Sequence, residues 1–162
     1  MSTRLFAGNF RAMGCSFRVC VATDSPRAAR RTVALARARV EQWEAVLSRF
    51  REESALCSLN RSSGSPMRVH PVLWQALRWA LWAAQATGGL YDPTVLDRLE
   101  AAGYRAGFEW APDVHALPEP GPTGFGRWRL VRIHRLRPVV ALPPGSRVGW
   151  ARRSSRSAWP RR

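Results

Sequence analysis

The fold of this chain depends on the stretch Thr87-Gly88-Gly89-Leu90-Tyr91-Asp92-Pro93-Thr94-Val95. Its two glycines permit left-handed backbone angles and the close approach of a ligand, and its proline fixes the turn that follows. Because the stretch comes directly after an apolar helical pattern, it predicts a rigid shelf that carries a carboxylate and a hydroxyl. A helix C-cap followed by an Asx turn, with no ligand, would use the same residues.

Two long helical patterns lie upstream of the shelf. Apolar residues recur at steps of three and four over 26–48, after a serine N-cap and with a proline at the first helical position. A second pattern over 71–88 ends at the glycines, and a short helix is expected over 95–102. The connection over 48–66 has few periodic signals and is expected to be irregular, apart from one helical turn at 54–60.

Strand patterns lie on both sides of these helices. Apolar and polar residues alternate over 10–22, which predicts a strand. Alternation over 127–133 and an apolar run over 138–142 predict a hairpin after a Pro- and Gly-rich loop at 111–126. The fold class is therefore α+β, with a mixed or antiparallel sheet packed with two long helices.

The positive charge is concentrated near the end of the chain. The 162 residues carry a formal net charge of +15, and all 26 basic residues are Arg. Residues 149–162 contain no acid and no core periodicity, so they are expected to form an Arg-rich disordered tail, separate from a domain over 1–148. A nucleic-acid surface normally uses Lys as well, so this bias is more typical of codon usage than of DNA binding.

Several classes of protein are excluded by what the sequence lacks. Its three Cys have no metal-ligand spacing, and ordinary thiols in a reducing compartment are expected. No secretory signal or lipobox is visible, and no apolar run reaches the roughly 20 residues that span a bilayer. The sequence therefore predicts a cytoplasmic protein without a membrane span.

Residues that could act as catalysts are sparse. The three His are scattered, and no Ser or Thr lies near a base in the sequence, so no catalytic residue is assigned. Trp74, Trp79 and Trp82 lie on the predicted helix over 71–88, where Trp more often belongs to a core or an interface than to a stacking platform.

Four motifs taken together resemble one enzyme family. They are Met13-Gly14, Ser48-Arg49-Phe50, Ser54 with Leu59-Asn60, and the shelf over 88–94. Their order and spacing are similar to those of the FAD:protein FMN transferases, the ApbE-type flavin transferases that are also described as thiamine-biosynthesis lipoproteins. The resemblance covers roughly residues 10–148.

The resemblance implies a reaction and a ligand. Family members take FAD, cleave its pyrophosphate with the help of magnesium, and attach FMN through a phosphoester bond to a Thr or Ser of an acceptor protein. Met13 would then pack against the flavin, and Phe50 would occupy a ligand-facing position that is often aromatic in the family. Leu90, Tyr91 and Asp92 would line the nucleotide half, with Asp92 accepting hydrogen bonds. A thioether and an aromatic ring suit a flat ring system, and a carboxylate suits hydroxyl or N–H groups.

The chain departs from the family after the strand over 138–142. Members are longer and continue with an Asp-Leu-Gly-Gly segment, a Lys-Gly pair, and a distal Asp and Thr that complete the magnesium site. None of these is found here, so no metal ligand is assigned, and the fold is expected to be incomplete. A shifted reading frame or a truncated gene after about residue 148 would explain the change.

Three functions remain open from the sequence. The first is a truncated flavin transferase, whose activity as written stays open because its expected magnesium ligands are missing. The second is a fragment that binds FAD without catalysis. A third is a small Arg-rich nucleic-acid-binding protein, which the near-balanced charge of the body disfavours, so FAD and an acceptor protein are the expected partners.

Overall fold

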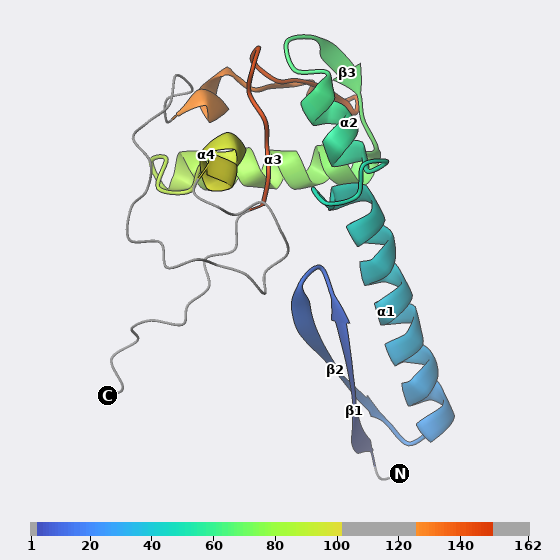
Figure 1. Ribbon diagram of the computed structural model, residues 1–162. Coiled ribbons are helices and arrows are strands. Elements are labelled where there is room, and N and C mark those ends of the chain that lie inside the picture. The colour runs from blue at the N-terminus through green and yellow to red at the C-terminus, as the bar shows by residue number, and fades with distance from the viewer. Residues whose placement is uncertain (1–2, 102–125, 151–162) are drawn as a thin grey trace, which may run out of the picture.

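The computed structural model describes residues 3–101 and 126–150 (Figure 1). A hairpin and the long helix α1 form one end of the structure, and three shorter helices with a second small sheet form the other end. Nearly all of the loop expected over 111–126, and residues 151–162 of the expected tail, lie outside the described residues.

The hairpin consists of β1 (Arg4–Ala12) and β2 (Cys15–Thr23), which pair antiparallel along their whole length. The single strand predicted over 10–22 is therefore wrong. The turn residues Met13 and Gly14 divide it, with φ angles of 52° and 67°. Two consecutive positive φ angles are typical of the tight turns that match the twist of a hairpin. The sequence concealed this turn because Met is an uncommon residue at such a position.

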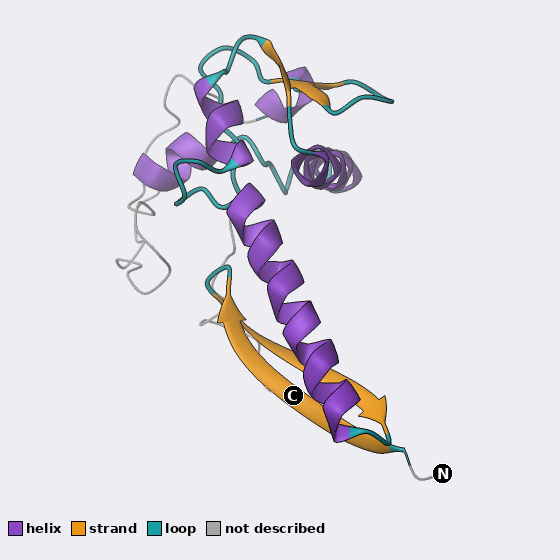
Figure 2. Cartoon of the chain, turned by 90° about the vertical axis from the view of Figure 1, so that its right-hand side faces the viewer, coloured by secondary structure: helices purple, strands orange, loops and turns teal. Residues whose placement is uncertain are grey.

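The helix α1 (Pro26–Leu47) packs along the hairpin, as Figure 2 shows from the side. Ser25 caps it by accepting a 3.3 Å hydrogen bond from the backbone N–H of Ala28, and Pro26 occupies the first turn, as the sequence predicted. Its C-terminal end packs against α3, so α1 joins the hairpin to the remainder of the fold (Figure 1).

The other end of the structure contains the remaining helices. The helix α3 (Pro71–Ala86) confirms the second long helix, and its N-cap is His70, whose side chain accepts from the N–H of Val72. The helices α2 (Ala55–Arg61) and α4 (Leu96–Ala101) lie near the positions expected for shorter helical segments. The first is longer than the single turn predicted because Ser54 caps it.

A small antiparallel sheet has the strand order β3–β5–β4. It is formed by β3 (Pro66–Arg68), β4 (Arg132–Ile133) and β5 (Val139–Ala141). The pairing of β4 with β5 confirms the second hairpin, but residues Arg127–Leu130, which the alternation assigned to a strand, form a 3₁₀ helix (η1). The sequence also missed β3, because its three residues become a strand only by pairing with β5.

The core lies between α2, α3 and this sheet. Its largest completely buried side chains come from segments far apart in the sequence and include Leu56, Leu59, Leu73, Leu77, Val140 and Val148. The expected α+β class with antiparallel strands and two long helices is confirmed. No helix within the described parts of the chain combines the length and apolarity needed to cross a bilayer.

Candidate functional site

The shelf begins where α3 ends. The Thr87 hydroxyl donates to the carbonyl of Ala83 at 2.8 Å and accepts from the backbone N–H of Tyr91 at 3.1 Å. Gly88 and Gly89 have φ angles of 62° and 91°, which only glycine adopts readily. The helix end and the glycine turn are thus fixed to each other by one threonine side chain.

Asp92 is the centre of the shelf. Its Oδ1 accepts from both the backbone N–H and the hydroxyl of Thr94, which forms the Asx turn that the sequence left as an alternative. Its Oδ2 accepts from the backbone N–H of Gly126 at 2.8 Å, which joins the shelf to a segment 34 residues away. An ionised carboxylate has about four acceptor positions, and donors within the described residues use three of them.

The two neighbours of Asp92 have different environments. Leu90 is 95% exposed, whereas Tyr91 is half-buried. Burial, and secondly the negative charge of Asp92, raise the pKa of the Tyr91 phenol, so it remains a neutral hydrogen-bond donor. The shelf therefore presents an apolar side chain to solvent beside a phenol and a carboxylate.

The loop after α1 forms a second part of the site. The hydroxyl of Ser54 donates to the carbonyl of Ser48 at 2.6 Å and accepts from the N–H of Cys57 at 3.0 Å, so it fixes the loop and caps α2 together. The ring of Phe50 is 56% exposed, and the guanidinium carbon of Arg49 lies 4.4 Å from its centroid. An exposed aromatic ring beside a cation is suited to stacking on a flat ligand.

A group of ion pairs joins the loop that carries Phe50 to α4 and to the segment after β5. Arg147 lies 2.6 Å from Glu100 and 3.0 Å from Asp97, and Arg49 lies 3.8 Å from the same Glu100. The hydrogen bond that Arg147 donates to Glu100 is the main cause that raises the pKa of Arg147, whereas burial lowers the pKa of Arg49. One acidic side chain on α4 thus connects the loop that carries Phe50 with the segment after β5.

Two hydrogen bonds to backbone carbonyls also hold the segment after β5 against the rest of the fold. The N–H of Gly149 donates to the carbonyl of Pro93 at 3.0 Å, and the indole N–H of Trp150 donates to the carbonyl of Leu47 at 3.1 Å. Packing of the chain into the body therefore continues through Trp150, two residues beyond the boundary expected at residue 148.

The five site residues expected from the sequence do not all lie together. Leu90, Tyr91 and Asp92 share the shelf, and the ion pair of Arg49 joins the Phe50 loop to Glu100 on α4, which follows the shelf in the chain. Met13 lies in the hairpin turn, which both views place beside α1 (Figures 1 and 2). Within residues 3–101 and 126–150, Met13 makes no hydrogen bond or ring contact with the other four.

Sequence reasoning missed Trp128 as part of the shelf. A Cβ placed on Gly89 would lie 3.5 Å from its indole nitrogen, so the indole ring packs directly on the glycine turn. This nitrogen is buried, and no acceptor for it is found among the described residues. The only signal in the sequence was the aromatic residue at this position. It was overlooked because the strand predicted over 127–133 placed Trp128 on one face of a sheet.

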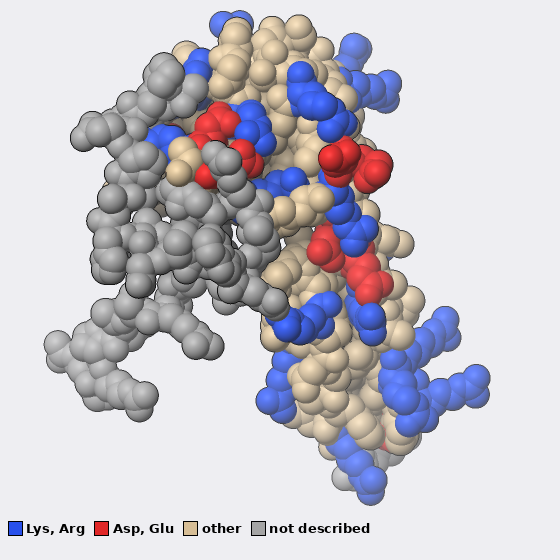
Figure 3. Space-filling model, viewed as in Figure 1, with Lys and Arg blue, Asp and Glu red and all other residues tan. Residues whose placement is uncertain are grey.

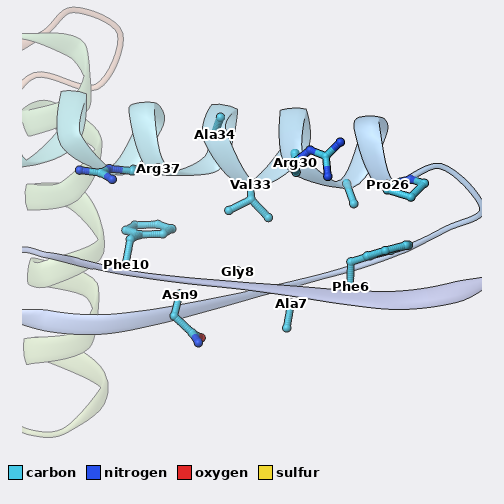
Figure 4. Close-up of a pocket in the computed structure, with 11 residues that line it drawn as sticks. Phe6, Ala7, Gly8, Asn9, Phe10, Pro26, Arg30, Val33, Ala34 and Arg37 are labelled. Atoms are coloured by element: carbon cyan, nitrogen blue, oxygen red, sulfur yellow. The ribbon is translucent and has the colours of Figure 1, made fainter.

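A groove of about 370 Å³ lies between β1 and α1 (Figure 4). Phe6 and Phe10 of β1 line one side, and Val33, Arg30 and Arg37 of α1 line the other. None of these residues was expected in a site. The groove is mainly apolar with two cations, whereas the acidic side chains gather in small clusters elsewhere, one of them over α4 (Figure 3).

Magnesium has no evident place in the described structure. Residues 3–101 and 126–150 contain no group of three or more His, Cys, Asp and Glu side chains placed to hold a metal ion. The carboxylate of Asp92 is used by backbone and hydroxyl donors, and those of Asp97 and Glu100 by Arg147. These residues do not fit a magnesium site.

The chain is similar to known proteins over much of its length. The model of the ApbE family matches residues 13–131. An FAD:protein FMN transferase of Treponema pallidum (strain Nichols) is 37% identical over 83 residues, which are 49% of this chain and 22% of that protein.

Two solved structures share the fold. The ApbE protein of Thermotoga maritima matches with a TM-score of 0.70 and 21% identity over 90% of this chain and 47% of its own. The apo form of the Pseudomonas stutzeri flavinyl transferase ApbE matches with a TM-score of 0.70 and 14% identity over 91% and 46%. The chain thus spans about half the length of these structures and less of the Treponema protein. The match to the family model covers most of the sequence, and the chain belongs to the ApbE family.

Proposed function

We propose that this chain acts in the transfer of FMN from FAD to a Thr or Ser of an acceptor protein, and that residues 1–148 form the N-terminal part of a flavin transferase domain. The family match over residues 13–131 supports this proposal. The observation that carries it is the attachment of the shelf to Gly126 through Asp92, because it fixes a polar edge at the end of α3.

The shelf would hold the nucleotide half of FAD. Leu90 offers an exposed apolar surface, Tyr91 a neutral phenol, and Asp92 a carboxylate, of which donors within the described residues use three acceptor positions and a hydroxyl or ring N–H would use the fourth. The indole N–H of Trp128, which lacks an acceptor among the described residues, lies against the same turn and supports a polar ligand there. The main role of Asp92 would be to hold the shelf in place, and its contact with the ligand would be secondary.

The flavin ring would lie toward Phe50. Its ring is exposed, and the adjacent guanidinium of Arg49 would pair with the negative charge of the pyrophosphate if Glu100 released it. Met13, on the separate hairpin turn, would contact the same ring from the β1–β2 side. FAD is thus proposed as the substrate and an acceptor protein as the second partner.

Magnesium supplies charge neutralisation to phosphoryl transfer in general. The described residues provide no ligand set for it, so no step of the reaction is assigned to a metal on them. We propose that the reaction requires Mg²⁺ and that its ligands come from outside the described residues.

The test uses the whole 162-residue chain with FAD, with and without Mg²⁺, and a Thr-containing acceptor peptide. Quenching of flavin fluorescence measures binding, and flavin fluorescence that remains on the peptide after denaturing electrophoresis measures transfer. Binding with Mg²⁺-dependent transfer is expected from a transferase. Binding without transfer would support the second candidate, an FAD-binding fragment, for which the absence of a metal ligand set among the described residues is the specific reason.

Two matched variants separate specific from general effects. Asp92→Asn should weaken FAD binding about ten- to a hundredfold, because the loss of one charged hydrogen bond costs roughly 1.5–3 kcal/mol. Asp24→Asn removes the same charge from an exposed position before α1 and should bind FAD as the wild type does. No binding of FAD by the folded wild-type chain would overturn the proposal.

A further inference from the structure

The outer side of α3 exposes two tryptophans. Trp79 and Trp82 are 61% and 62% exposed and pack edge to face, with ring centroids 5.8 Å apart. The opposite side of the same helix is buried in the core through Leu73, Leu77, Ala80 and Ala84. Large exposed apolar side chains that lie together mark an interaction surface.

The loop between β4 and β5 lies next to this helix. The indole N–H of Trp74 donates to the carbonyl of His134 at 3.1 Å, which fixes the loop to α3. The Nδ1 atom of His134 accepts from the N–H groups of Leu136 and Arg137, both at 3.1 Å, and these two hydrogen bonds fix the conformation of the loop. Figure 2, in which α3 is seen end-on, shows the loop projecting beyond the strands.

The loop carries an apolar tip between two cations. Leu136 is 88% exposed, and its neighbours Arg135 and Arg137 are also exposed. A hollow of about 420 Å³ connects the loop to the helix and is lined by Arg78 and Trp82 on one side and by Arg135 on the other. The aromatic–arginine surface is thus continuous and consists of Arg78, Trp79, Trp82, Arg135, Leu136 and Arg137.

The charge of this surface has one sign. The sequence contains no Asp or Glu in residues 66–91 or in residues 126–150, the two segments that build it. Its guanidinium groups therefore have no acidic neighbour on their own segments. A partner that covers it should carry negative charge.

We propose that the aromatic–arginine surface docks on an anionic phospholipid membrane. Indole rings favour the boundary between water and hydrocarbon, an exposed Leu at a loop tip can insert below it, and guanidinium groups pair with lipid phosphates in a bidentate manner. A nucleic acid would use the cations, but it would leave Leu136 without a partner.

The test uses the whole chain and phosphatidylcholine vesicles with and without phosphatidylglycerol, in a sedimentation assay. Binding to the anionic vesicles is expected, together with quenching of Trp fluorescence by brominated lipid. The double variant Arg135→Gln/Arg137→Gln should bind about thirtyfold more weakly, because each basic residue near an anionic surface contributes on the order of fivefold. The variant Trp79→Ala/Trp82→Ala should lose most of the binding and most of the quenching.

The controls remove the same groups elsewhere. Arg27→Gln/Arg31→Gln lowers the net charge equally on exposed positions of α1, and Trp43→Ala removes a partly exposed indole from the same helix. Both should bind nearly as the wild type does, and circular dichroism should show that all variants fold. Equal loss in the α1 variants would overturn the proposal, since it would reflect net charge alone. Binding of a single-stranded oligonucleotide by this surface, without vesicle binding, would overturn it as well.

Discussion

The side-chain amide of Asn60 is paired with the backbone of Val148, donating to its carbonyl and accepting from its N–H, both at 2.9 Å. Val148 is completely buried, so water cannot replace these bonds. Asn60→Ala should lower the free energy of unfolding by about 1–3 kcal/mol, because it leaves a buried donor and acceptor unpaired. Urea unfolding followed by circular dichroism measures this change.

An exposed amide provides the control for this prediction. Asn9→Ala, on β1, should change the stability by no more than about 0.5 kcal/mol. Asn60→Asp keeps the acceptor for the Val148 N–H but places a charge beside its carbonyl, so it should also be destabilised. If Asn60→Ala unfolded at the wild-type urea concentration, the segment after β5 would not be held by α2.

Glu100 pairs with two cations, Arg49 and Arg147, whereas Asp97 pairs with Arg147. Removal of the Glu100 charge should therefore cost more stability than removal of the Asp97 charge. Glu100→Gln should lower the stability by about 1–2 kcal/mol, because Arg49 and Arg147 would then repel each other. Asp97→Asn removes one partner of Arg147 alone and should cost less than about 1 kcal/mol. Added salt should recover part of the loss in Glu100→Gln, because it screens the repulsion. Equal losses, both independent of salt, would contradict this arrangement.

Gly8 permits α1 to pack on the hairpin. A Cβ at this position would lie 2.4 Å from Cγ1 and 2.9 Å from Cγ2 of Val33, whose side chain has little rotamer freedom in a helix. Gly8→Ala should therefore lower the stability by about 1–3 kcal/mol. The double variant Gly8→Ala/Val33→Ala should be more stable than the sum of the single changes indicates. Strict additivity in thermal unfolding would mean that the helix and strand do not touch here.

The two long helices could be predicted because their signals are local. Their apolar residues recur with the helical period, and each begins with a proline at its first turn and a side-chain cap. The Asx turn at Asp92 is also local, since Asp92 and Thr94 are two residues apart. The shelf was therefore predictable in its own conformation.

Contacts across the sequence could not be predicted in the same way. The strand β3 exists because β5, more than 70 residues later, pairs with it. The bond from Gly126 to Asp92 and the ion pairs of Arg147 depend equally on packing between distant segments. The turn of the first hairpin was missed for a different, local reason. The apolar–polar alternation of β2 continues back across Met13, so the sequence pattern shows no break where the chain reverses.

The phenol of Tyr91 provides a test of the shelf in alkaline solution. Burial first, and the charge of Asp92 second, raise its pKa above the ordinary 10.0, so the folded state resists ionisation that the unfolded state allows. Its contribution to stability is complete below the unfolded pKa of about 10 and is lost as the pH rises through the higher folded pKa.

Absorbance at 295 nm during alkaline titration, as the difference between the wild type and Tyr91→Phe, isolates this group from the second tyrosine. The difference should show a pKa above 10.0. In the Asp92→Asn background the same difference should titrate at a lower pH, because the neighbouring charge is gone. The pKa should remain raised in that background as long as the phenol stays buried. Asp24→Asn should leave the titration unchanged. A Tyr91 that titrates at or below its ordinary value in the folded wild type would show that Tyr91 is not enclosed beside Asp92, and the proposed nucleotide edge would lose its neutral donor.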